Sequence, residues 1–217
     1  MSSFKESNLA QAWLVLVFAT VFGTALAGIQ AKLGPVIEAN KIKETMEKIP
    51  SLVLGEDGAS KIDHPLSINA RKVEIKKNGI TKFYTVYDAF FKDGALAGHV
   101  AKAAGQGYAD KIELLVGLDP GGNTITGLFI LDQKETPGLG NKIIEKLWRD
   151  QFLAQTSAQN LVVVKGKTGK AHEIDAISGA TISSRSVTGI VNHTIADIKS
   201  QLVLPLKKEM RKIEETQ

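Results

Sequence analysis

The longest apolar stretch of the chain lies near its N-terminus. Residues 7–31 contain no charged side chain, and residues 12–29 are apolar almost throughout. Because a helix needs about 20 consecutive apolar residues to cross the hydrocarbon core of a bilayer, the pattern predicts one N-terminal transmembrane anchor within residues 1–33. A cleaved signal peptide is the alternative, since Ala25 and Ala27 have the small-x-small spacing of a cleavage site. The length of the run and its continuation into a helical segment favour the retained anchor.

Charged and apolar residues follow the anchor at helical spacing. Residues 34–50 predict an amphipathic stem helix that ends at Pro50, because proline lacks the backbone N–H that a helix interior needs. The Gly-Glu-Asp-Gly segment at 55–58 predicts a loop. Residues 51–217 are therefore predicted to form an extramembrane domain.

Alternation of apolar and polar residues predicts several strands in this domain. Residues 73–77 and 81–87 flank an Asn-Gly dipeptide, which is the strongest short-range signal for a hairpin. Residues 112–117 and 124–131 predict a second pair of strands, joined by an Asp-Pro-Gly-Gly turn. Residues 94–107 are rich in glycine and alanine, and their pattern predicts no definite element.

Helical periodicity returns in the second half of the domain. A β-branched run at residues 161–164 predicts a buried strand, and a helix is predicted after it from residue 184 to 202, with Ser183 or Ser184 as its N-cap. A shorter helix is predicted after residue 140. The predicted apolar faces comprise Val187, Ile190, Val191, Thr194, Ile195, Ile198 and Leu202 in the C-terminal helix, and Ile143, Ile144, Leu147, Trp148 and Phe152 in the earlier one. These elements predict an α+β fold with a mixed or antiparallel sheet and packed helices.

The composition excludes several kinds of site. With no cysteine, the chain has no disulfide, thiolate zinc site or cysteine-ligated iron–sulfur cluster. Its four histidines are scattered without metal-ligand spacing, so no metal site is predicted and the histidines are expected to be solvated or capping. The net charge is +4, but lysines and acids are interspersed, which argues against a nucleic-acid-binding protein. Redox chemistry would need a bound organic cofactor or a metal held by other ligands.

The most suggestive segment is the Ser-Gly-Ala-Thr loop at residues 178–181. It precedes the C-terminal helix, whose free N–H groups and positive dipole end favour an anion, phosphate above all. Gly179 lets the backbone approach such a group closely, and Ala180 adds little bulk. Taken alone, the pattern also fits an ordinary capped helix after a glycine turn.

A second motif, Glu-Thr-Pro-Gly-Leu-Gly, occupies residues 135–140 at the end of a predicted strand. Its Pro-Gly pair fits the centre of a type II turn. Taken alone, this hexapeptide is a connector between a strand and a helix.

Together the two motifs resemble the FMN-binding domain of the Rnf-type and Na⁺-pumping quinone reductase-type membrane electron-transfer complexes. Residues 105–108, Gly-Gln-Gly-Tyr, are similar to a glycine–aromatic segment of the same family. The resemblance implies that Thr181 carries FMN through a phosphoester bond, which a separate Mg²⁺-dependent flavin transferase makes with FAD as donor. It also implies that the second motif lies over the flavin ring, which has polar edges and apolar faces. The cofactor-binding residues that it implies are Ser178, Gly179, Ala180 and Thr181 in the loop, and Glu135, Thr136, Leu139 and Gly140 in the turn.

The implied function is electron transfer by covalent FMN in a membrane ion-translocating ferredoxin:NAD⁺ oxidoreductase (Rnf) complex. No residue is expected to act as a catalytic acid or base, so the chain is an enzyme only as one component of a redox-driven translocase. The G subunit of the Rnf complex and the C subunit of the Na⁺-translocating NADH:quinone reductase share the motifs, and the short chain favours the first. The expected partners are other membrane and cluster-bearing subunits and membrane lipid. A reading of another class is an anchored, non-redox module that holds a phosphorylated ligand reversibly.

Two arguments about orientation disagree. Lys5 precedes the predicted span, whereas Lys32, Lys41 and Lys43 follow it, and this bias would place the domain in the cytoplasm. The family resemblance implies the opposite, a single-pass inner-membrane protein with its domain on the extracytoplasmic, periplasmic side. We prefer the resemblance, because two of these lysines alternate with glutamates on the predicted stem.

Overall fold

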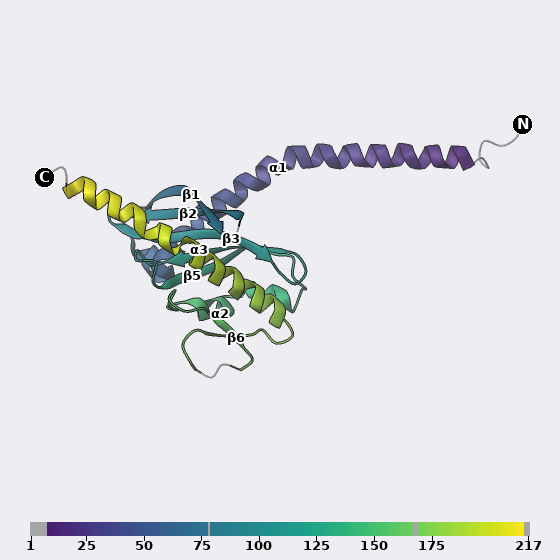
Figure 1. The fold of residues 1–217 in the computed structure, drawn as a ribbon. Helices are drawn as coiled ribbons and strands as arrows, with labels where there is room; N and C mark the ends of the chain where they lie inside the picture. Colours follow the sequence, from purple (N-terminus) through teal and green to yellow (C-terminus); the bar gives the residue numbers. More distant parts are fainter. Residues whose placement is uncertain (1–7, 78, 167–168, 215–217) are drawn as a thin grey trace, which may run out of the picture. The chain divides into compact units, whose positions relative to one another are not determined.

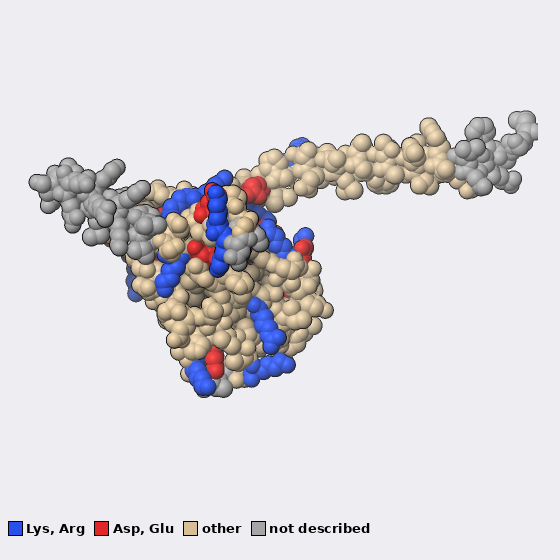
Figure 2. All heavy atoms as spheres, viewed as in Figure 1, with Lys and Arg blue, Asp and Glu red and all other residues tan. Residues whose placement is uncertain are grey.

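The computed structural model describes residues 8–77, 79–166 and 169–214, and the chain divides into two compact units at Glu44 and Thr45. Helix α1 (Asn8–Lys61) runs through the first unit and into the second (Figure 1). In the first unit it is long and apolar enough to cross a membrane, and its most apolar stretch is not buried. Figure 2 shows that this part carries few charged side chains, whereas charges of both signs are scattered over the second unit. The predicted extents of the membrane anchor and of the extramembrane domain stay predictions, whereas the predicted end of the stem helix can be compared with α1.

The prediction that the stem ends at Pro50 is wrong. Helix α1 passes through this proline, leaves helical geometry only at Gly55 (φ 75°, ψ 165°) and then continues to Lys61, so residues 55–58 are not a loop. An internal proline costs about 3 kcal/mol. Burial of Ile49, Leu52 and Val53 offsets this cost, since each large apolar side chain contributes about 1.5–3 kcal/mol.

The second unit is built on a five-stranded antiparallel sheet in the order β1-β2-β3-β4-β5. Its strands are β1 (Ser67–Lys77), β2 (Ile80–Phe90), β3 (Leu96–Gln106), β4 (Lys111–Leu118) and β5 (Ile125–Asp132). Both predicted strand pairs are confirmed. In the first of them, Lys77 pairs with Ile80 across the predicted turn, of which Gly79 has φ 76° and Asn78 lies outside the described residues.

Strand β3 was not predicted, because its small residues hide the alternation. The small residues allow close packing against neighbouring elements. A Cβ atom on Gly105 would lie 2.5 Å from Ile190 Cγ1, so the strand needs glycine there to accept the C-terminal helix. The composition that obscured the strand in the sequence therefore results from tertiary contact.

Each face of the sheet has its own core. Helix α3 (Thr181–Glu214) covers one face, and all seven residues of its predicted apolar stripe are buried. The other face packs against the segment of α1 around Ile49, Leu52 and Val53. The fold class is therefore confirmed as α+β with an antiparallel main sheet and packed helices.

The segment between β5 and α3 differs from its prediction. Instead of one helix, residues 140–152 form a 3₁₀ turn η1 (Gly140–Ile144), the short helix α2 (Lys146–Arg149) and a second 3₁₀ turn η2 (Asp150–Phe152). Ile143, Trp148 and Phe152 are buried as predicted, whereas Ile144 is half exposed and Leu147 is 88% exposed. The predicted strand near 161–164 exists as β6 (Val162–Val164), but it pairs in parallel with β7 (Glu173–Asp175) in a small separate sheet and its first residue is exposed.

Candidate functional site

The two sequence motifs meet at one cavity of about 850 Å³. Natural ligand pockets span about 300–1,000 Å³, so the volume suits an organic cofactor. The lining comprises Tyr108, Thr136, Leu139, Gly140, Lys165, Gly166 and residues 175–183. Seven of the eight predicted cofactor-binding residues are in this set, and Glu135 is the exception.

The loop at residues 178–181 is a tight turn that ends in the first residue of α3. The Ala180 N–H donates to the Ile177 carbonyl at 2.9 Å, and Gly179 has φ 80°, a conformation that strongly favours glycine. A Cβ atom on Gly179 would lie 3.0 Å from Leu139 Cδ2, so the loop also lies close to the second motif. Thr181 is half-buried at the cavity wall, where the first N–H groups of a long helix have no intrahelical acceptor.

The predicted N-cap is wrong, because α3 begins at Thr181, three residues before the predicted start at residue 184. Ser183 and Ser184 therefore lie inside the first helical turn, and both are buried. The Ser184 hydroxyl donates to the Ala180 carbonyl and accepts the Ile177 N–H, each at 3.0 Å. The Ser183 hydroxyl donates to Glu135 Oε2 at 2.5 Å. Both hydroxyls therefore bind neighbouring segments of the same chain to the start of α3, and neither caps the helix.

The second motif forms the turn that its Pro-Gly pair predicts. The Leu139 N–H donates to the Thr136 carbonyl at 3.2 Å, and Gly138 has φ 77°, as the third position of a type II turn requires. Thr136, Leu139 and Gly140 line the cavity. The Glu135 side chain points inward instead and is 4% exposed.

Several residues of the lining carried no functional prediction, among them Lys165, Gly166 and Asp175. Lys165 brings a cationic side chain to the lining, and the Gly166 N–H beside it donates to Asp175 Oδ1 at 2.9 Å. Asp175 lies three residues before the loop, so its position in the sequence was a usable signal. Lys165 had no such signal, because only the pairing of β6 with β7 brings it next to the loop.

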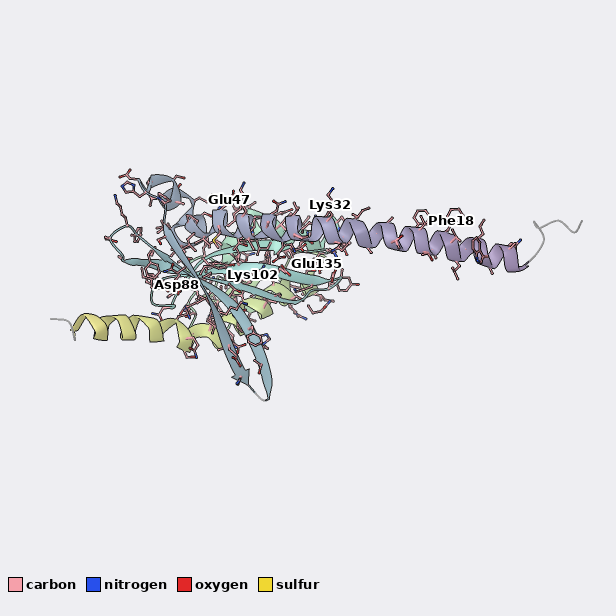
Figure 3. The ribbon with its side chains drawn as sticks, turned by 90° about the horizontal axis from the view of Figure 1, so that it is seen from above. Phe18, Lys32, Glu47, Asp88, Lys102 and Glu135 are labelled. Atoms are coloured by element: carbon pink, nitrogen blue, oxygen red, sulfur yellow. The ribbon has the colours of Figure 1, made fainter. Side chains whose placement is uncertain are left out.

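One histidine departs from the expectation that all are solvated or capping. His99 is 2% exposed on β3, and its Nδ1 lies 2.5 Å from Asp88 Oδ1 on β2. Burial opposes ionisation of Asp88, but hydrogen bonds with His99 and Arg71 outweigh it and hold the pKa of that carboxyl below its usual value. Asp88 and Glu135 lie well apart in Figure 3, so this buried cluster is separate from the cavity. Within the described ranges, no group of three or more His, Asp or Glu side chains could hold a metal ion.

Comparison with known proteins identifies the fold and the family. Residues 107–196 match the model of the FMN-binding domain. Over 105 residues the chain is 42% identical to the G subunit of the Na(+)-translocating ferredoxin:NAD(+) oxidoreductase complex of Acetobacterium woodii, a match that covers 48% of this chain and half of that protein. It is 31% identical over 173 residues to the G subunit of the ion-translocating oxidoreductase complex of Pasteurella multocida, covering 77% of this chain and 84% of that one. The chain belongs to the FMN-binding domain family.

A solved structure has a similar fold. The crystal structure of Shewanella oneidensis NqrC superposes with a TM-score of 0.60 at 20% identity, covering 76% of this chain and 99% of that one. At this identity the likeness concerns the fold alone.

The cavity residues fit FMN on chemical grounds. FMN has a phosphate, polar ring edges and apolar ring faces. The cavity offers the Thr181 hydroxyl at a helix N-terminus, the polar residue Thr136, and the partly exposed apolar side chains of Leu139 and Ile182. Tyr108 and Lys165 add an aromatic ring and a positive charge to the same lining.

Proposed function

We propose that this chain carries FMN covalently on Thr181 and transfers electrons as one component of a membrane ion-translocating oxidoreductase complex of the Rnf type. The observation that carries the proposal is the convergence of the two motifs on one cavity, with Thr181 on its wall at the start of α3. The names of the relatives, which include subunits of such complexes, support the choice of complex.

Attachment needs an activated hydroxyl, since a threonine oxygen is a weak nucleophile at its ordinary pKa. The residues that line the cavity include no histidine that could serve as its base. We therefore infer that a separate Mg²⁺-dependent flavin transferase acts on the chain with FAD. Thr181 Oγ would attack the phosphorus of the FMN half. The new Oγ–P bond forms as the pyrophosphate P–O bond breaks, AMP leaves, and the hydroxyl proton passes to a base of the transferase.

In this proposal the protein positions the cofactor and does no acid–base chemistry. Bound FMN supplies the electron-transfer chemistry, while the chain fixes its position, its surroundings and its distance from partner centres. The apolar part of α1 would serve as the membrane anchor, surrounded by lipid, with the domain on the extracytoplasmic side. A covalent bond suits that location, because free FMN would diffuse away from an exported site. The partners would be other membrane and cluster-bearing subunits of the complex.

Intact mass of the full chain, purified from cells with an active flavin transferase, tests the central point. We expect an excess mass of one FMN phosphoryl ester, localised to the peptide that contains Thr181. After denaturing electrophoresis, flavin fluorescence should stay with the wild-type band and vanish from Thr181→Ala. Ser200→Ala is the matched control, because it removes an exposed hydroxyl of α3 outside the cavity lining and should keep the fluorescence.

A dark wild-type band and an unmodified mass would overturn the proposal and favour a module that binds a phosphorylated ligand reversibly. The C subunit of the Na⁺-translocating NADH:quinone reductase is the close alternative within the family. A gene for a ferredoxin-like cluster protein beside this one would favour the Rnf complex, whereas a quinone reductase gene set would favour the alternative.

A further inference from the structure

Glu135 is buried beside the cavity without lining it. Its Oε1 accepts the Ala109 N–H at 3.1 Å, and its Oε2 accepts the Ser183 hydroxyl at 2.5 Å. One carboxylate therefore joins three segments that are distant in sequence: the turn after β3, the turn after β5 and the first turn of α3. Among the described residues this carboxylate makes no ion pair, so the hydrogen-bond donors of the neighbouring segments hold it in place.

Two glycines leave the space that this arrangement needs. A Cβ atom on Gly140 would lie 2.7 Å from Ser183 Oγ and 2.9 Å from Glu135 Oε2. A Cβ atom on Gly107 would collide with Glu135 Oε1 and would lie 2.6 Å from the Asp110 carbonyl. Distances under 3.0 Å force a displacement, so alanine at either position would push the carboxylate off its partners.

Helix geometry connects this arrangement to Thr181. Residues two apart on an α-helix point to nearly opposite sides, because each residue turns the helix by about 100°. Ser183 contributes to the cavity lining, but its hydroxyl is directed to the buried Glu135, whereas Thr181, two residues earlier, lies half-buried at the cavity wall. A rotation of the first turn that released Ser183 would carry Thr181 away from the cavity.

We propose that Glu135 is a positioning residue, whose hydrogen bond with Ser183 fixes the first turn of α3 so that the Thr181 oxygen faces the FMN cavity. The inference rests on the proposed function and deepens it. It replaces direct contact between Glu135 and the cofactor with an action through Ser183. It also explains, by one hydrogen bond and the space around it, why these residue types occupy positions 107, 135, 140 and 183.

The test compares four full-length variants in detergent: Glu135→Ala, Ser183→Ala, their double variant, and Glu135→Gln. The matched control is Glu145→Ala, which removes an exposed carboxylate close in sequence. The first readout is the rate of covalent FMN attachment by purified transferase with FAD, followed by intact mass. The second is the fluorescence anisotropy and visible circular dichroism of the attached flavin, which stability alone does not change in folded protein.

We expect each alanine variant to slow attachment about tenfold or more, since displacing a reacting group by about 1 Å can cost a hundredfold. The double variant should be no slower than the slower single variant, because both remove the same interaction. Glu135→Gln should keep most of the rate and anisotropy, since its amide oxygen can accept the Ala109 N–H and its NH₂ group can donate to Ser183. The control should match wild type.

Folded Ser183→Ala with wild-type rate and anisotropy would overturn the proposal, as would additive losses in the double variant. Glu135→Ala is expected to be the least stable variant. If Glu135→Ala fails to fold, the two single variants Ser183→Ala and Glu135→Gln decide the question. An unlabelled wild-type chain would instead remove the covalent proposal itself, so the two failures are distinguishable.

Discussion

The sheet core and the candidate cofactor site of the same domain are held together by different forces. The core between β-strands and α3 consists almost wholly of apolar side chains, with Ile112, Leu114 and Ile198 fully buried. Beside the cavity, buried Glu135, Ser183 and Ser184 exchange hydrogen bonds across three chain segments. Apolar packing tolerates small shifts, whereas a buried polar group must keep its partners or lose about 1–3 kcal/mol. The site is therefore the part of the domain where geometry is most tightly specified.

The largest effect should come from the apolar core. Phe152→Ala removes a fully buried ring that packs edge-on against Trp148, with ring centroids 5.3 Å apart. We expect the free energy of unfolding to fall by about 3–5 kcal/mol. Chemical denaturation of the full chain measures it. Leu147→Ala, at a side chain that is 88% exposed, should change stability by less than about 0.5 kcal/mol. A small loss at Phe152 would contradict the assignment of η2 to the core.

Overpacking of the polar site should have the next largest effect. Gly140→Ala would push against Ser183 and Glu135, and we expect it to lower stability by about 1–3 kcal/mol and to reduce FMN attachment. The control is Gly189→Ala on α3, where an added Cβ atom meets nothing within 4 Å. That variant should stabilise the helix by about 0.4–1 kcal/mol. If both substitutions changed the free energy of unfolding in the same direction, the crowding at Gly140 would be refuted.

The buried polar cluster of Asp88, His99 and Arg71 should make the stability of the domain depend on pH. The pKa of Asp88 is lower in the folded protein than its ordinary value of 3.8, so its ionised form stabilises the fold. This contribution is complete well above 3.8 and is lost as the pH falls through that value toward the lower folded pKa.

We therefore expect wild type to lose more stability than Asp88→Asn between about pH 6 and about pH 3, measured by thermal unfolding. At neutral pH the substitution should cost about 1–3 kcal/mol, because it weakens the bonds to His99 and Arg71. Asp57→Asn, at an exposed carboxylate, should follow the wild-type pH profile. Parallel profiles for Asp88→Asn and wild type would contradict the argument.

The smallest expected effect concerns the contact between α1 and β5. Thr126 Oγ1 donates to the Leu52 carbonyl at 2.6 Å, just before the helical break at Gly55. Thr126→Val should cost about 0.5–1.5 kcal/mol, measured by denaturation. Thr126→Ser keeps the hydroxyl and should recover most of the loss, and an equal loss in both variants would assign the effect to the methyl group.

Local pattern predicted much of this fold and both halves of the site. The hairpin between β1 and β2 and the buried stripe of α3 follow from periodicity, and each motif contributes to the cavity. The failures have tertiary causes. Helix α1 continues through Pro50 because buried neighbours offset its cost. Strand β3 was not predicted because its small residues hide the alternation, and two of them, Gly98 and Gly105, are required by close contacts with Val53 of α1 and Ile190 of α3.

The inward orientation of Glu135 could not be predicted either. Its partners lie 26 and 48 residues away in the sequence, and no local pattern encodes such pairings. A resemblance between motifs locates the functional region, whereas only the fold decides which side chain touches the cavity and which supports it from behind.

The bond between Thr126 and Leu52 has a mechanical consequence. Near its first residues, strand β5 is joined to α1 by this hydrogen bond. Three residues past its last residue, the chain reaches Glu135, which is hydrogen-bonded to Ser183 of α3. A strand extends by about 3.3 Å per residue and cannot shorten without losing its hydrogen bonds. Strand β5 therefore connects the α1 segment around Leu52 rigidly to the base of the cavity, so a displacement at one end of the strand is expected at the other.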